Sequence, residues 1–215
     1  MKRILLACVL GLSLPLFSGC QSAYYSAMEQ VGIHKRDILV DRVEDTRNAQ
    51  DEAQQQFLSA LEQFRSVVSF DGGQLEEVYN DLQTEYDRSA AAAEEVSDHI
   101  RKVEDVSEAL FEEWEEELEQ YTSSKLRSQS ARSLRDTKAR YRTLHASLKK
   151  AESKMQPVLS GLLDNTLYLK HNLNARAIGA LRGELAGIQQ DINRLVAEMQ
   201  RSIKQSDQFI RDMKQ

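Results

Sequence analysis

The sequence predicts an all-α protein, an elongated antiparallel four-helix bundle in which the helices pack as in a coiled coil. Three observations indicate this fold. Ala, Glu, Gln, Leu, Arg and Ser dominate the 215 residues, a composition typical of long helices. Only two prolines interrupt it. Apolar residues also recur at alternating intervals of four and three, which is the spacing of a narrow apolar seam along a helix.

The first twenty residues have the features of a bacterial lipoprotein signal. A basic start at residues 1–3 precedes an apolar stretch over 4–17, which is shorter than the roughly 20 residues of a membrane span. The stretch Leu16-Phe17-Ser18-Gly19-Cys20 resembles a lipobox. We therefore expect cleavage of a signal peptide, residues 1–19, and attachment of lipid to Cys20. An ordinary cleaved signal and an uncleaved anchor are the alternatives.

The expected processing determines the location and the charge of the mature chain. Gln21 follows the cysteine, and resemblance to the sorting rule, in which aspartate there retains a lipoprotein in the inner membrane, favours the outer membrane, facing the periplasm. Cleavage removes Cys8 and the lipid consumes Cys20, so no thiol or disulfide remains. Loss of two bases leaves 26 against 34 acids, a net charge of −8 that argues against a nucleic-acid partner.

A membrane-proximal segment, residues 20–36, follows the anchor almost without a linker. Tyr24 and Tyr25 suit the depth of lipid headgroups, and Lys35 and Arg36 suit an anionic surface. The segment therefore either docks on the membrane or closes the bottom of the bundle.

The apolar spacing divides the rest of the chain into four helices of similar length, within a bundle spanning 37–215. Two glycines in Phe70-Asp71-Gly72-Gly73 mark the first turn. We place the last reversal at 171–174 because it gives helices of matched length, and a reversal at Pro157 is the alternative. The predicted helices cover residues 25–69, 74–121, 125–171 and 175–213.

Opposite charges concentrate on either side of the second reversal. Residues 104–119 contain nine carboxylates and no base, whereas residues 125–154 contain ten bases and two acids. In an antiparallel hairpin the two stretches would lie side by side, so the charges could set its register. The alternative is a charged surface for a partner, for which the candidate residues are Trp114, Glu115, Glu116, Arg127 and Arg132.

Small residues recur every four positions in the last predicted helix, at Gly179, Gly183 and Gly187. Each glycine costs a helix up to about 1 kcal/mol relative to alanine, so a close backbone contact would compensate. The stripe therefore predicts a helix-packing seam, either inside the bundle or between two copies in a homo-oligomer.

No constellation of catalytic or metal-binding residues is visible. Metal-binding helical bundles use Glu-x-x-His pairs, but none of the four histidines has a glutamate three places earlier. Phosphate-loop and nucleophile-elbow motifs are absent as well. We expect no enzyme, no catalytic residue, no metal and no cofactor.

Three longer strings resemble a family. They are the stretches over 32–43 (GIHKRDILVDRV), 70–73 (FDGG) and 169–176 (LKHNLNAR). Together they resemble an uncharacterised proteobacterial family, domain of unknown function 2959, over essentially the whole mature chain. The resemblance implies an envelope setting and brings no established activity.

These observations favour a structural or interaction role. We expect a lipid-anchored periplasmic scaffold or adaptor that presents the 104–154 hairpin end to an unknown envelope protein. The alternative is a membrane-surface or lipid-binding module that acts through the segment next to the anchor. Partner identity and oligomeric state stay open at this point.

Overall fold

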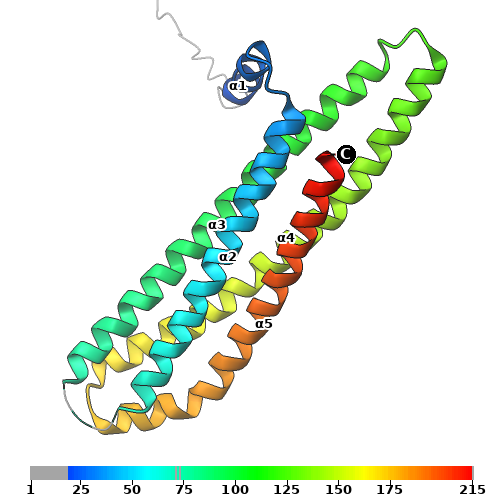
Figure 1. Cartoon of the computed structure of the whole chain (residues 1–215). Coiled ribbons are helices and arrows are strands. Elements are labelled where there is room, and N and C mark those ends of the chain that lie inside the picture. The colour runs from blue at the N-terminus through cyan, green and yellow to red at the C-terminus, as the bar shows by residue number, and fades with distance from the viewer. Residues whose placement is uncertain (1–18, 71, 73, 215) are drawn as a thin grey trace, which may run out of the picture. The chain divides into compact units, whose positions relative to one another are not determined.

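The computed structural model describes residues 19–70, 72 and 74–214, in which every regular element is an α-helix (Figure 1). The predicted signal peptide therefore lies outside the described residues except for Gly19. The chain divides into two units, residues 1–34 and residues 35–215, which are considered separately. None of the described helices is long and apolar enough to cross a membrane.

Helix α1 (Gly19–Gln30) is the one regular element described in the first unit. It ends in a Schellman motif, in which Gly32 N–H donates to the Glu29 carbonyl at 2.9 Å and Ile33 N–H to the Met28 carbonyl at 3.0 Å. Gly32 has a φ of +83°, a conformation that glycine adopts without strain. The predicted helix over 25–69 is thus wrong at its start, because this glycine ends one helix before the next begins.

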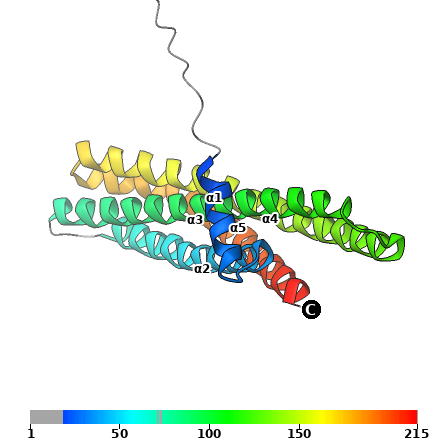
Figure 2. The same cartoon turned by 90° about the horizontal axis from the view of Figure 1, so that it is seen from above.

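The second unit is a bundle of four antiparallel helices. They are α2 (Lys35–Val68), α3 (Leu75–Leu118), α4 (Ser124–His171) and α5 (Ala175–Lys214). Within this unit α2 packs against α3, α3 against α4, α4 against α5 and α5 against α2, so the four form a closed ring (Figures 1 and 2). The predicted all-α bundle is confirmed.

The core of the bundle is the apolar seam that the sequence predicts. Phe57 and Phe64 of α2, Ile100 of α3, Leu148 of α4 and Leu195 of α5 are all fully buried. Burial of a large apolar side chain contributes about 1.5–3 kcal/mol, so these layers hold the four helices together.

The turns lie close to the predicted positions. Helix α4 continues through Pro157 to His171, which confirms the reversal at 171–174. Asn174 caps α5, since its Oδ1 accepts from the backbone N–H of Arg176 at 3.0 Å and of Ala177 at 3.2 Å. At the same end, the Arg182 guanidinium donates to the Val68 carbonyl, which secures the last turn of α2.

Candidate functional site

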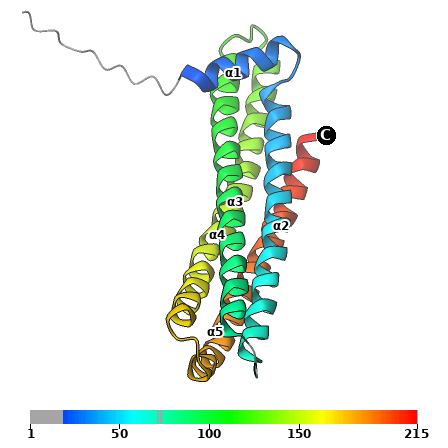
Figure 3. The same cartoon turned by 90° about the vertical axis from the view of Figure 1, so that its left-hand side faces the viewer.

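The charged hairpin, residues 104–154, extends beyond the four-helix section of the bundle. Lys35, the first residue of α2, pairs with Glu113 at 2.9 Å. The Arg36 guanidinium donates to the carbonyl of Met213, near the end of α5. Beyond this level α3 and α4 continue together, and all three views show their connection beyond the end of α5 (Figures 1 to 3). We call residues 115–132 the hairpin tip.

The hairpin tip is held by local contacts. Ser123 caps α4, because its side chain accepts from the Leu126 N–H at 3.4 Å. The Trp114 indole N–H donates to the Ser130 hydroxyl at 2.8 Å, which joins the two helices at the base of the tip. Tyr121 is 41% exposed and Leu126 is 52% exposed, so the tip presents some apolar surface to solvent.

Charges pair across the hairpin as the register interpretation predicts. Glu104 lies 3.8 Å from Lys149 and forms a hydrogen bond with His145 at 2.6 Å, and Glu115 contacts Lys138 at 2.6 Å. Within the hairpin tip, Glu119 also pairs with Arg127. Exposed pairs of this kind contribute about 0–1 kcal/mol each, so they determine alignment more than stability.

Two of the four charged residues among the five candidate partner-binding residues lack an ion partner. Glu115 and Arg127 are paired within the hairpin, and Trp114 is bonded to Ser130. Glu116 and Arg132 are exposed and, within the part of the chain that is described, form no ion pair. The structure thus does not gather the five side chains into one free surface.

An aromatic contact between α3 and α4 escaped the sequence analysis. The rings of Phe111 and Tyr141 meet edge to face at 5.5 Å, and Tyr141 stacks on His145 at 5.7 Å. Lys138 Nζ lies 5.4 Å from the centroid of the Phe111 ring. Phe111 follows Leu110 in the sequence, next to the apolar pattern of α3. This position faces α4, and it was the signal that could have predicted the aromatic contact.

The surroundings of Tyr141 raise the pKa of its hydroxyl. Burial raises the pKa of the Tyr141 hydroxyl, a hydrogen bond with Ser107 opposes the rise, and the nearby carboxylates of Glu104 and Glu108 add to it. The ring contacts with Phe111 and His145 make Tyr141 a packing group between α3 and α4.

A small polar pocket of about 230 Å³ lies at the base of the hairpin, where α2 begins and α5 ends. Three of its four charged side chains are engaged with the protein: Arg36 donates to the Met213 carbonyl, and Arg140 Nε lies 3.7 Å from Asp212 Oδ2. The volume is below the usual range for ligand pockets, about 300–1,000 Å³. No group of acidic, histidine or cysteine side chains that could hold a metal occurs among the described residues.

The membrane-proximal residues belong to two different units. Tyr24 and Tyr25 lie on α1, with their rings 5.4 Å apart in an edge-to-face arrangement. Lys35 and Arg36 begin α2 and contact the bundle through Glu113 and Met213. Cys20 is the second residue of α1, and its side chain lies outside the described part of the structure.

The glycine stripe of α5 faces solvent. Gly179, Gly183 and Gly187 are exposed, and a Cβ added at any of them would meet no atom within 4 Å. The prediction of a seam inside the bundle is therefore wrong, because Gly179 and Gly183 are each two residues, or about 200° of helix rotation, from the buried Leu181.

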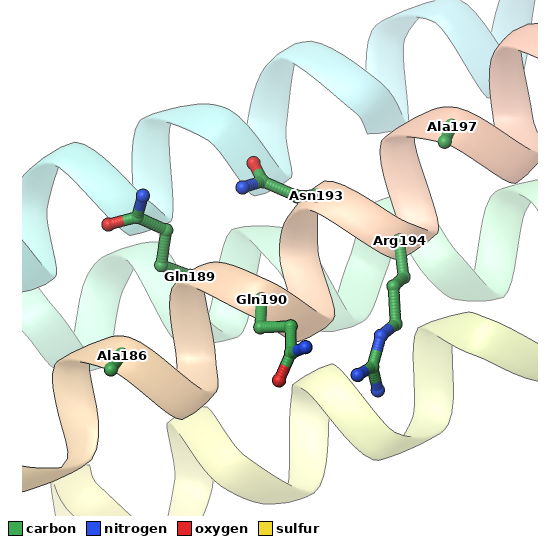
Figure 4. Close-up of a pocket in the computed structure, with 6 residues that line it drawn as sticks. All are labelled: Ala186, Gln189, Gln190, Asn193, Arg194 and Ala197. Carbon is green, nitrogen blue, oxygen red and sulfur yellow. The ribbon is translucent and has the colours of Figure 1, made fainter.

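An open hollow follows the same face of α5 toward the C-terminus (Figure 4). Ala186 and Ala197 lie at its two ends. Between them Gln189 and Asn193 lean to one side of the helix, and Gln190 and Arg194 lean to the other. All of its lining residues come from α5, so it is a shallow surface feature and not an enclosed binding site.

Comparison with known proteins adds the family. A family model described as a protein of unknown function (DUF2959) matches residues 24–213. The chain belongs to this family. No curated protein and no solved structure matches the chain. The residues matched by the DUF2959 model include α1 from Tyr24 onward and the bundle up to residue 213. The description of the family names no activity.

Proposed function

We propose that the chain is a lipid-anchored envelope protein that acts as a scaffold or adaptor and carries out no catalysis. It would hold a partner protein at the turn end of the bundle, where α2 joins α3 and α4 joins α5. The observation that carries this proposal is a group of exposed apolar side chains within seven residues of that end. Leu167, Tyr168 and Leu173 are 42–43% exposed. Exposed apolar side chains that lie near one end of a molecule are candidates for an interaction site.

Chain direction supports the choice of the turn end. Cys20 precedes the first residue of α2 by fifteen residues, and α2 begins at the hairpin end of the bundle. The 34 residues of α2 cover about 50 Å at a helical rise of 1.5 Å per residue. A lipid on Cys20 would thus leave the turn end as the part that reaches furthest into the periplasm.

The charged hairpin is the weaker candidate for partner binding. Several of its carboxylates, those of Glu104, Glu115 and Glu119, are already paired with basic side chains of the same hairpin. It also lies at the end where α2 begins, which lipid attachment would keep close to the membrane. This revises the expectation that the 104–154 end meets the partner.

Lipid attachment is tested by metabolic labelling of the full chain with a fatty-acid probe in a bacterial host. We expect Cys20→Ser to abolish the label and to leave the unprocessed chain. Cys8→Ser is the matched control, since it also removes a cysteine but leaves the lipobox intact, and it should keep the label. Equal labelling of the wild type and Cys20→Ser would contradict the anchor.

Partner docking is tested by placing a photo-crosslinking amino acid at single exposed positions in intact cells. Leu173 probes the turn end, Leu126 probes the hairpin tip, and Gln205 on α5 is the control. We expect a discrete heavier adduct from Leu173 alone. An adduct from Leu126 but none from Leu173 would move the partner to the hairpin, and no adduct at either position would reject the scaffold proposal.

A further inference from the structure

A polar layer interrupts the apolar core halfway along the contact between α2 and α5. Gln50 of α2 and Ser202 and Ser206 of α5 are fully buried, and Gln54 of α2 is 8% exposed. Within the described part of the chain, both amide atoms of Gln50, the Gln54 Oε1 and the two serine hydroxyls have no protein hydrogen-bond partner. Buried polar groups are nearly always hydrogen-bonded to protein or to ordered water.

The register of the two helices brings these side chains to one level. Arg47 and Asp207 pair at 3.1 Å and fix the antiparallel alignment of α2 and α5. Gln50 comes three residues after Arg47 on α2, and position 204 comes three residues before Asp207 on α5. Gln50 therefore lies opposite position 204, which is between Ser202 and Ser206. One helical turn further along α2, Gln54 lies opposite position 200 of α5 by the same register.

The two serines differ from three other buried hydroxyl side chains of the bundle. Thr46, Ser89 and Thr166 each donate to the carbonyl four residues earlier in their own helix, at 2.7–2.8 Å. Such back-bonding is the usual way in which a buried hydroxyl is satisfied within a helix. Ser202 and Ser206 are mid-helix residues with the same opportunity, but neither hydroxyl takes it. Their hydroxyls are thus free to bond a group between the helices.

Gln50 has small neighbours on its own helix. Ala49 and Ala53 flank it on α2, and both are buried. A buried water typically makes about three hydrogen bonds to polar groups that lack other partners. We infer that an ordered water molecule lies between α2 and α5, bonded to the Gln50 amide and to the hydroxyls of Ser202 and Ser206.

Thermal unfolding of the full chain tests the linkage among these groups. The variant Ser202→Ala/Ser206→Ala removes two of the water's partners, and Gln50→Leu removes the third, so each should lower the unfolding midpoint. The triple variant removes all three groups that would bond the water, so no group is left to require it, and its midpoint should recover to that of the wild type or exceed it. Simple addition of the separate losses would overturn the inference.

The matched control uses a buried hydroxyl that is already satisfied. Thr166→Val removes the hydroxyl that donates to the Leu162 carbonyl, at a level remote from Gln50. Its shift in midpoint should add to that of Gln50→Leu without coupling. A high-resolution crystal structure of the wild-type chain gives an independent readout if a variant fails to fold. Density for a water between Gln50 and both serines supports the site, and direct bonds among these side chains overturn it.

Discussion

Replacing the solvent-facing glycines of α5 with alanine should stabilise the bundle. Gly179, Gly183 and Gly187 lie inside a continuous helix, and a Cβ at each would point into open space. None of them has a positive φ, so alanine fits the backbone without strain. The triple variant Gly179→Ala/Gly183→Ala/Gly187→Ala therefore gains helix propensity and loses no packing.

The expected gain follows from the number of sites. Glycine to alanine at a compatible helix position stabilises by about 0.4–1 kcal/mol, so three sites give about 1–3 kcal/mol. For a chain of this size each kcal/mol raises the unfolding midpoint by about 2–4 °C, so the midpoint should rise by roughly 2–12 °C. The reverse change on the same face, exposed Ala180→Gly, should lower stability by about 1 kcal/mol.

Urea unfolding followed by circular dichroism measures the free energy, and sedimentation at several protein concentrations measures association. A less stable triple variant that remains monomeric would refute the reasoning, because it would mean that these positions pack against another part of the chain. If the wild type is a dimer and the triple variant a monomer, the stripe is a seam between copies, as the homo-oligomer alternative predicts.

Further predictions concern the core, a cap, a charge cluster and the membrane segment. Phe57→Ala should cost about 3–5 kcal/mol in urea unfolding, since Phe57 is fully buried. Asn174→Ala should cost about 1 kcal/mol through lost capping. Burial opposes the shift, but Lys150 and Arg201 lower the pKa of the Glu198 carboxyl. The stability that Glu198 contributes is therefore present above the pKa of the unfolded chain and is lost as the pH falls through the pKa of the folded chain. Glu198→Gln should therefore flatten the acid side of a stability–pH curve. An unlipidated chain should not float with anionic liposomes, because Lys35 and Arg36 already contact other residues of the bundle. Flotation of this chain that is abolished by Lys35→Ala would refute the prediction.

The four-helix arrangement could be predicted because its causes are local. Alternation of apolar residues by four and three marks one face of each helix whatever its neighbours do, and Asn174 carries a cap signal in the sequence itself. The break before α2 was missed because the apolar pattern runs across it. Gly32 was the available signal, since a left-handed φ at a helix end favours glycine.

The surface could be predicted less well, because the register of the helices decides which charged side chains pair and which residues face solvent. The opposite charges of residues 104–119 and 125–154 indicated a paired hairpin, but the partner of Glu113 is Lys35, on a helix whose alignment the composition does not give. The four-residue glycine repeat of α5 could face inward or outward. Only its offset from Leu181 and the neighbouring buried residues decides between them.

Because α5 packs against α2, the bundle would tolerate rearrangement of its chain order. Arg36 already reaches the Met213 carbonyl, so a short linker from the end of α5 to the beginning of α2 would join them with little loss of entropy. New termini could then be opened in the exposed connection 119–122 between α3 and α4. The resulting circular permutant, ordered α4, α5, α2, α3, would keep every helix beside both of its present neighbours.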